Sequence, residues 1–486
     1  MKRIVLLIAM SLNYFVACKD PGGAGNATSG DSTRVTEAKS SKPSSVAEEV
    51  IYQRAFQSAI WGMPAVNYYL MYKEMVDKVK GGYNQVVYWS GLLNWQNQTL
   101  TPNPDVIYLM PFFNTKDVGP VVLEIPPADS GIFNGSVMDY WQAAIEDVGP
   151  GGVDKGRGGR YLILPPGYAK EKVPAGYIPM PSYTYQGYAL LRSVLKDGSA
   201  EGVRQAVAYA RRIKVYPLSQ ANHPPATVFL DAQNILYDAT IPYDKRFFEA
   251  LDAMVQSEPF LERDRVMVEQ LRSIGIYRGQ AFNPDARKQE LMVSALQDAK
   301  VYLDDMYDHF ETYYPGKRWF FPVTKDYHDN IARDFKVPDT YPVDNRGLIY
   351  SIAFFSAKHV GEAQFYLLNT KDKDGHALDG SKTYKVNVPG NVPVKQYWSI
   401  TVYDRATHAF IRNLDRQGRS SQSPGLQKNG DGSVDIYFGP KPPAGKEANW
   451  VPTDPAGKFE LLARFYGIEQ VFFKKEWQLN DVEEVK

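Results

Sequence analysis

The sequence has almost no cysteine, since Cys18 is the single one among 486 residues. One cysteine cannot form an internal disulfide, so the folded part has to be stabilised by packed cores. An excess of either charge is also missing, with 55 Lys and Arg residues against 55 Asp and Glu residues. Because a balanced chain has no overall field that attracts polyanions, we expect no nucleic-acid partner.

Motifs of known catalytic and metal-binding sites are missing as well. There is no Gly-x-Ser-x-Gly string, and Cys18 belongs to the leader rather than to the folded part. A Ser or Thr could still meet one of the six His residues in the folded chain. The best metal pattern, His359 with Glu362 on one helix face, provides only half of a site. The sequence therefore predicts no metal and no cofactor, and it leaves open whether the protein is an enzyme.

Long apolar runs are rare, and the clearest one lies at the amino terminus. Two basic residues precede an apolar stretch over residues 4–12, and Val16 and Ala17 lead directly into Cys18. A short basic start, an apolar run of about 7–15 residues and small residues before the cut are typical of a signal peptide. We predict a signal peptide over residues 1–17 and acyl chains on Cys18 that bind the lipid bilayer. The alternative is an ordinary signal peptide with an unrelated cysteine.

This anchor predicts the location of the protein. We expect it to be exported and lipid-anchored in a bacterial envelope, on the periplasmic or the outer-surface side. Residues 18–44 are predicted to be a disordered tether. Val35 is the only large apolar residue between positions 19 and 43, so this segment cannot bury enough surface to fold.

The first folded region is predicted over residues 45–215 and combines a helix with a β-sandwich. Ser45 and Glu48 form a capping box at the start of the helix, and Pro64 should break or kink it. Short apolar runs separated by Pro, Gly and Asn then predict the strands of a sandwich or small barrel. From residue 185 to residue 215 the apolar residues return to helical spacing and predict a helix.

A helical domain is predicted over residues 216–345, and a second β domain over residues 346–486. In the helical domain, Asn283 and Pro284 have the form of a cap and a first turn, and their helix should reach about Tyr313. The last region returns to strands and turns typical of another β-sandwich. Because no fixed-period repeat links the two β regions, we predict a multidomain α and β fold with two different β domains.

Several strings of residues in the folded region are motifs of known families. In the first half they are Thr101–Tyr108, Pro120–Leu123 and Arg160–Gly167. In the second half they are Asp374–Gly375, Leu378–Gly380, Tyr397–Tyr403, Asp431–Ser433, Asn449–Pro452 and Arg464–Gly467. Together these strings resemble exported bacterial proteins in which domain-of-unknown-function family 1254 is followed by domain-of-unknown-function family 1214.

The resemblance implies an architecture but no agreed reaction. The implied parts are an immunoglobulin-like β-sandwich, a helical middle domain and a jelly-roll-like β-sandwich at the carboxyl end. The chain departs from the family pattern after Trp477, where the family usually continues with prolines and this sequence has Gln478 and Leu479. Because a fold does not determine a function, the function has to be argued from a site.

The most informative candidate site lies around Asn103, Asp105 and Tyr108. Pro102 and Pro104 hold the backbone extended, so an amide, a carboxylate and a phenol are presented at fixed positions. Asp105 and Tyr108 are the candidates for catalysis. The alternative is that Asn103 and Asp105 only accept hydrogen bonds from loop amides. Further candidates for ligand binding offer stacking surfaces, amides or cations, and they are Tyr140, Trp141, Gln142, Trp398, Arg412 and Arg464.

These residues support a binding role first. If the polar groups of both β domains face one cleft, they suit a small acidic or hydroxyl-rich ligand, including a glycan. The first alternative is a hydrolase or lyase that uses Asp105 as general acid or base, and a cavity shared by Asp105 and Arg464 would favour it. The second alternative is a structural or assembly module of the cell envelope, for which a homo-oligomer is an open question.

Overall fold

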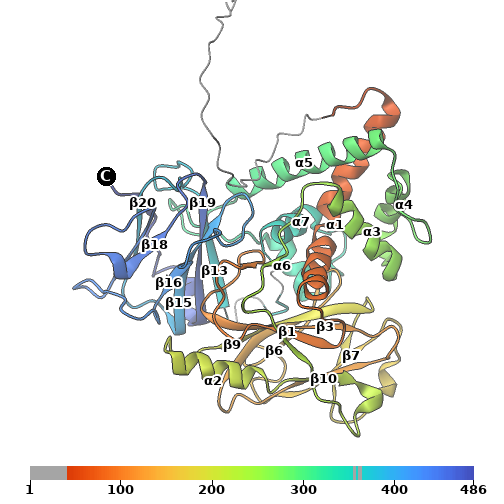
Figure 1. Ribbon diagram of the computed structural model, residues 1–486, viewed down its shortest axis with the longest axis horizontal. Coiled ribbons are helices and arrows are strands. Elements are labelled where there is room, and N and C mark those ends of the chain that lie inside the picture. Colours follow the sequence, from red (N-terminus) through yellow and green to blue (C-terminus); the bar gives the residue numbers. More distant parts are fainter. Residues whose placement is uncertain (1–40, 354–356, 360–363) are drawn as a thin grey trace, which may run out of the picture. The chain divides into compact units, whose positions relative to one another are not determined.

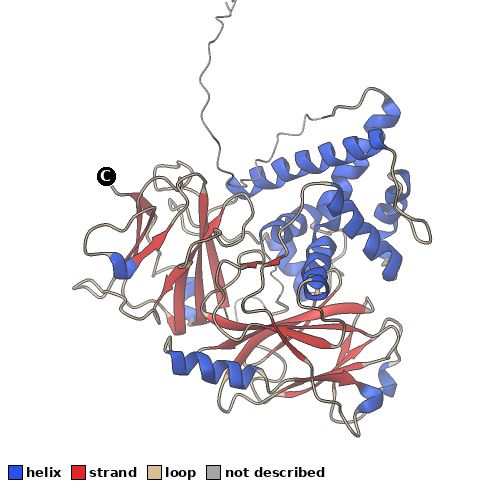
Figure 2. Ribbon diagram, viewed as in Figure 1, coloured by secondary structure: helices blue, strands red, loops and turns tan. Residues whose placement is uncertain are grey.

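Seven α-helices and twenty β-strands make up the part of the chain that the structure describes (Figure 1). This computed structural model describes residues 41–353, 357–359 and 364–486. The predicted signal peptide, Cys18, the tether up to residue 40 and Glu362 lie outside these residues. No helix within the described ranges is both long and apolar enough to cross a membrane. Figure 2 shows that most of the helices gather in one region, apart from the two regions of strands, whereas α2 (Ala200–Ala210) lies beside the strands of the first β region.

The first β region consists of two sheets that pack face to face. Along β3, Ile107 and Leu109 point into the core between the sheets, whereas Tyr108 and Met110 point to the opposite face. The six-stranded sheet has the order β11 (Phe229–Asp231), β1 (Gln85–Tyr88), β3 (Val106–Asn114), β9 (Gln186–Val194), β5 (Ile132–Asp139), β6 (Ala144–Val148). The four-stranded sheet has the order β10 (Lys214–Pro217), β4 (Val121–Ile125), β7 (Gly159–Leu164), β8 (Ile178–Pro181).

The predicted helix over residues 185–215 is wrong in its first part. Residues 186–194 form β9, and only α2 (Ala200–Ala210) is helical. Every residue of β9 is buried, because the strand lies between β3 and β5 with a core on each face. A strand buried on both faces has a continuous apolar sequence, which periodicity alone does not distinguish from a buried helix.

The helices are organised around α1 (Val46–Asp77). Half of the predicted capping box forms, since the Ser45 side chain accepts a hydrogen bond from the Glu48 amide at 3.2 Å. The Glu48 carboxylate accepts from the backbone amide of Ser44 at 2.7 Å instead of from that of Ser45. The helix continues past Pro64, and the Pro64 carbonyl accepts a hydrogen bond from Gln142 Nε2 at 2.9 Å. The N-cap of α5 is Asp285, two residues after the predicted Asn283. Four helices pack against α1, namely α3 (Lys245–Ser257), α4 (Arg265–Ser273), α5 (Ala286–Asp308) and α7 (Val343–Ile352), and α6 (Lys325–Ala332) precedes α7.

The second β region also pairs two sheets around a core. Along β19, Leu461, Ala463 and Phe465 point into this core, and Leu462 and Tyr466 point to the other face. One sheet has the order β13 (Gln364–Asn369), β19 (Phe459–Ile468), β15 (Val394–Asp404), β16 (Gly418–Ser420). The other has the order β18 (Trp450–Pro452), β17 (Val434–Gly439), β14 (Tyr384–Val388), β20 (Val482–Glu484). A short parallel pair, β2 (Asn97–Gln98) and β12 (Tyr237–Asp238), completes the strands.

A third core joins both β regions to the helices. It contains Tyr108 and Met110 from β3, Leu462 and Tyr466 from β19, and side chains of several helices. Polar residues that point into this core are therefore brought together from distant parts of the sequence. The predicted fold class, multidomain with α and β parts, is confirmed. The predicted domain boundaries stay predictions.

Glu258 connects the helical region to the first β region. It is the C-cap of α3 and is fully buried. Its carboxylate accepts hydrogen bonds from the amides of Tyr185 and Gln186, at 2.7 and 3.1 Å, where β9 begins. Burial raises the pKa of Glu258 to about 7, and these two hydrogen bonds oppose the rise.

The raised pKa predicts a pH-dependent contribution of Glu258 to stability. An acid whose pKa is higher in the folded state destabilises the fold as pH rises from its unfolded pKa, near 4.5, to its folded pKa, about 7. We expect the free energy of unfolding of Glu258→Gln, relative to the wild type, to increase by about 3 kcal/mol between pH 4 and pH 8. Urea denaturation at a series of pH values measures it. Glu249→Gln, at a half-exposed position of α3, is the control, and a pH-independent difference for Glu258→Gln would contradict the prediction.

Candidate pocket between the two β regions

A pocket lies where the two β regions meet the helical region. About 50 Å³ of it is open to the centres of water-sized molecules, which is room for a few waters or a small ligand group. Its polar lining comes from strands and loops of both β regions, and its apolar lining comes largely from the segments around α6 and α7. The residues that line it are Thr101, Tyr108, Arg192, Phe321, Pro322, Val323, Ile349, Ile352, Ala353, Tyr366, Leu368, Leu462 and Arg464.

Arg192 and Tyr108 form one polar side of the pocket. β3 and β9 are antiparallel neighbours and place these two residues directly opposite each other. Arg192 Nε donates a hydrogen bond to the Tyr108 hydroxyl at 3.1 Å, and its guanidinium lies 5.3 Å from the Tyr108 ring centre. Within the described ranges, the terminal amino groups of Arg192 have no hydrogen-bond partner. Arg192 therefore keeps donors for a ligand.

Arg464 forms another polar part of the lining. It is 2% exposed, and β13 and β15 place Tyr366 and Ser399 opposite it. Its Nη1 donates to Thr401 Oγ1 at 2.9 Å, and its Nη2 donates to the Thr101 carbonyl at 2.7 Å and to the Tyr403 hydroxyl at 2.6 Å. All of these acceptors are neutral. Hydrogen bonds thus hold the Arg464 side chain in place without neutralising its charge.

The charge of the pocket lining is positive. Arg192 and Arg464 are its only charged residues among those the structure describes, and no carboxylate lines it. Arg192 has no carboxylate partner among the described residues. A buried cation without a counter-ion is costly, and a ligand carboxylate bound by charge-assisted hydrogen bonds removes that cost. Chemically, the pocket is arranged to bind a small anion with an apolar body.

The backbone is strained at Thr101, beside Arg464. Thr101 has a positive φ of 37°, which is an outlier for a β-branched residue. Two hydrogen bonds fix this conformation, because its amide donates to the His408 carbonyl at 2.6 Å and its carbonyl accepts from Arg464. Such strain costs of order 1–3 kcal/mol and is concentrated at functional sites. The strained residue lines the pocket, which supports a functional role for it.

Asn103 holds Tyr108, which lines the pocket, but neither Asn103 nor Asp105 lines the pocket itself. The amide of Asn103 donates to the Tyr108 hydroxyl at 3.2 Å, and its Nδ2 donates to the hydroxyls of Tyr397 and Tyr466. Burial raises the pKa of the Asp105 carboxyl, and Arg464 opposes that rise. Asp105 Oδ2 is buried without a hydrogen-bond partner among the described residues. Asp105 and Arg464 therefore interact electrostatically, but Asp105 does not line the pocket.

The remaining predicted ligand-binding residues lie away from the pocket. Tyr140 and Trp141 are packed in the core, where their rings contact Tyr68 and Trp61. The other three have structural partners: Gln142 binds Pro64 O, Asn67 and Tyr188, Trp398 is buried in the core of the second β region, and Arg412 binds Gln98 and Asp238. The structure thus brings Tyr108 and Arg464 together at the pocket, and none of these five.

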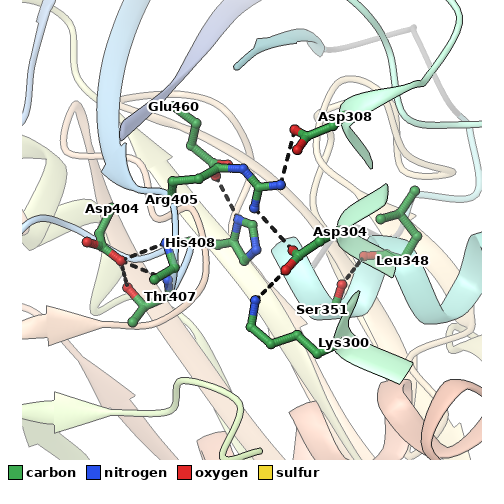
Figure 3. A network of polar contacts seen from close by, with 11 residues as sticks. Lys300, Asp304, Asp308, Leu348, Ser351, Asp404, Arg405, Thr407, His408 and Glu460 are labelled. Atoms are coloured by element: carbon green, nitrogen blue, oxygen red, sulfur yellow. Dashed lines mark hydrogen bonds and ion pairs between the residues drawn. The ribbon is translucent and has the colours of Figure 1, made fainter. Parts of the chain in front are cut away.

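Figure 3 shows a second polar cluster, and the Thr101 amide joins it to the pocket through the hydrogen bond to the His408 carbonyl. His408 Nδ1 lies 2.9 Å from Glu460 Oε1, and both side chains are buried. Arg405 pairs with Asp304 at 3.2 Å and with Asp308 at 3.1 Å, and its Nε lies 4.0 Å from Glu460. This cluster connects α5 to β15 and β19, and the His408 carbonyl connects it to Thr101.

The described residues contain no group of three or more His, Cys, Asp or Glu side chains that could hold a metal ion. His359, the residue considered for a metal, has its Nε2 3.1 Å from Glu146 Oε1. Its proposed partner Glu362 lies outside the described residues.

Comparisons with known proteins identify the two β regions. Residues 83–217 match the family described as protein of unknown function (DUF1254), and residues 363–470 match protein of unknown function (DUF1214). The chain belongs to the proteins that combine these two families. In this DUF1254–DUF1214 protein, both families contribute to the pocket: Thr101, Tyr108 and Arg192 fall in the first match, and Tyr366, Leu368, Leu462 and Arg464 in the second.

One solved structure resembles this DUF1254–DUF1214 protein in fold. The crystal structure of the VPA0106 protein from Vibrio parahaemolyticus is 17% identical, with a TM-score of 0.56 over 90% of this chain and 100% of that one. A putative uncharacterized protein from Burkholderia cenocepacia is 12% identical, with a TM-score of 0.40 over 90% and 94% of the two chains. No curated protein matches the chain.

The residue of the DUF1254–DUF1214 pocket that sequence reasoning missed is Arg192. It stands in the apolar run of β9, where Leu190, Leu191 and Val194 surround it. A charged residue inside a buried run is unusual and signals a paired or functional charge. The sequence contains this signal. Because residues 185–215 were predicted to be a helix, however, the strand face on which Arg192 lies could not be predicted. No comparable sequence signal marks Tyr366 or the apolar residues that line the pocket.

Proposed function

We propose that the protein binds a small organic acid in the pocket, with the ligand carboxylate on Arg192 and Arg464. The observation that carries the proposal is the Arg192 guanidinium, whose terminal amino groups have no partner within the described ranges and which lines the pocket. A planar guanidinium matches a carboxylate with two parallel hydrogen bonds. Tyr108 holds the guanidinium through Nε and leaves the terminal groups for the ligand.

The lining favours an acid with an apolar body over a hydroxyl-rich ligand. Beyond the two guanidiniums, the polar lining is limited to Thr101, Tyr108 and Tyr366, and the other eight residues are apolar. A sugar needs many directional hydrogen bonds, whereas an apolar body needs only contact and exclusion of water. Of the ligand classes considered from the sequence, the acidic one therefore has the stronger support.

Titration of the purified protein with matched ligands tests this proposal. We would compare butanoate with 1-butanol and butylamine, which share its apolar chain, and with glucose as a hydroxyl-rich ligand. Isothermal titration calorimetry should detect butanoate binding and no binding of the other three. Equal binding of the alcohol and the acid would show that the guanidiniums do not select the ligand, and the proposal would fall.

The two alternatives have less support. A hydrolase or lyase that uses Asp105 needs this carboxylate in the pocket, and Asp105 is not among the residues that line it. An assembly module needs an exposed surface for its neighbours rather than a charged interior pocket.

We propose in addition that the protein is an exported lipoprotein held by acyl chains on Cys18. The basic start, the apolar run and the Val16-Ala17-Cys18 site support this proposal. In a bacterial host, we expect the wild-type protein in the membrane fraction, and Cys18→Ser in the soluble envelope fraction or retained as an unprocessed precursor. Metabolic labelling with an alkyne fatty acid, followed by mass spectrometry, should find lipid on the wild type alone. A labelled Cys18→Ser protein would disprove the anchor.

We also propose an immunoglobulin-like sandwich for the first β region and a jelly-roll-like sandwich for the second. Two sheets on a common core support both names, and the eight strands of the paired sheets in the second region match the number in a jelly roll. A strand-by-strand superposition on reference folds of both kinds tests them, and a different order of connections would reject either name.

A further inference from the structure

A larger groove adjoins the pocket. About 630 Å³ of this groove is open to the centres of water-sized molecules, compared with about 50 Å³ of the pocket. Phe321 and Val323 line both spaces, so the pocket and the groove adjoin at these two residues. Met306, Phe310, Tyr313, Lys325 and Lys475 also line the groove.

The groove has an apolar floor and a charged rim. Met306, Phe310 and Tyr313 are half-buried and continue the apolar surface of Phe321 and Val323 away from the guanidiniums. The charged groups at the rim are exposed, and several already have partners, such as Lys475 with the Tyr313 carbonyl at 2.7 Å and Lys325 with Asp329 at 2.5 Å. The floor therefore suits an apolar chain, and the rim does not select a second charge.

We propose that one unbranched aliphatic monocarboxylic acid occupies both spaces, with its carboxylate on Arg192 and its chain passing Phe321 and Val323 into the groove. The inference rests on the proposed function and extends it to the length of the ligand. The pocket alone has room for a carboxylate and a few carbons, because only about 50 Å³ is open in it. A longer chain would extend past Phe321 and Val323, which line both spaces, into the groove.

The proposal predicts that affinity rises with chain length. Each methylene buried against the groove floor should lower Kd by about fourfold. We would measure Kd for butanoate, hexanoate, octanoate and decanoate with the full chain, below the concentration at which each acid aggregates. In the wild type, Kd should fall at each step until the chain reaches the end of the floor.

A bulky side chain on the groove floor should remove this gain. In Met306→Trp, which changes a residue of the groove that does not line the pocket, decanoate should bind at least tenfold more weakly than in the wild type, and the Kd of butanoate should stay within threefold. Val118→Trp is the matched control, because Val118 is an exposed turn residue outside both spaces. Its Kd values should equal those of the wild type.

Photolabelling gives a second measurement that needs no variant. A decanoic acid with a diazirine at its far end, irradiated in the wild-type protein, should label a peptide that contains Met306, Phe310 or Tyr313. Labelling elsewhere, or a Kd that does not change beyond butanoate, would overturn the chain path and leave the proposed function intact. If no acid binds at all, the proposed function is wrong, and the inference falls with it.

Discussion

Replacing Arg192 with methionine should weaken the binding of an organic acid about 100-fold or more. Two hydrogen bonds from a guanidinium to a carboxylate contribute about 1.5–3 kcal/mol each, and methionine provides neither. The stability of the fold should not decrease, because methionine fills a similar volume without a buried charge. We expect the free energy of unfolding to increase by about 1–2 kcal/mol. Calorimetric titration and urea denaturation measure the two effects on the same sample.

The combination of both effects makes this prediction specific to a binding site. A purely structural arginine would lower stability when it is removed, whereas a binding arginine is a cost to the empty protein. Arg204→Met is the control, since Arg204 is exposed on α2 and pairs with Glu201 on the same helix. It should leave the Kd unchanged and alter stability by less than about 0.5 kcal/mol. Unaltered acid binding by Arg192→Met would remove Arg192 from the site.

Replacing Arg405 with methionine should destabilise the protein by about 3–5 kcal/mol. Arg405 is the cation between Asp304, Asp308 and Glu460 in the cluster of Figure 3. Glu460 is fully buried, and Arg405 is the arginine that faces it in this cluster, with Nε 4.0 Å from the carboxylate. The free energy of unfolding from urea denaturation gives the effect. Arg265→Met, which breaks an exposed pair with Glu262, should cost less than about 1 kcal/mol.

A double variant separates the charge effect from lost packing. If the cost of Arg405→Met comes from leaving the Glu460 carboxylate unpaired, then Glu460→Gln in the same chain should recover about half of it, because glutamine has no charge to compensate. The cycle needs both single variants and the double variant. Strictly additive losses would show that the two side chains do not interact, and the ion pair would then contribute no stability.

Part of the candidate site could be predicted from local sequence. The two prolines beside Asn103 predict a rigid, extended segment. The structure places Tyr108 of the same motif in the pocket together with Arg464. Asp105 belongs to the same segment, yet its carboxylate lies outside the pocket. The sequence indicates which segment is rigid. Successive side chains of a rigid, extended segment point in different directions, however. Which of these directions faces the pocket depends on the strands that pack against the segment.

The sequence by itself determined the features that depend on near neighbours. Ser45 and Glu48 cap α1 because the hydrogen bond between them spans three residues. Alternation along β19 places Leu462 on one face and Leu461 on the other because a strand has a period of two. Balanced charge, the single cysteine and the family motifs are likewise properties of the sequence alone.

The tertiary structure alone decided which faces meet. Residues 186–194 are a strand because β3 and β5 satisfy their backbone groups, and this pairing puts Arg192 opposite Tyr108. Arg192 and Arg464 share a pocket because the outward faces of two sheets enter one core, although 271 residues lie between them in the sequence. Strand pairing and core packing depend on contacts between distant residues, and no local pattern encodes the partner of a buried charge.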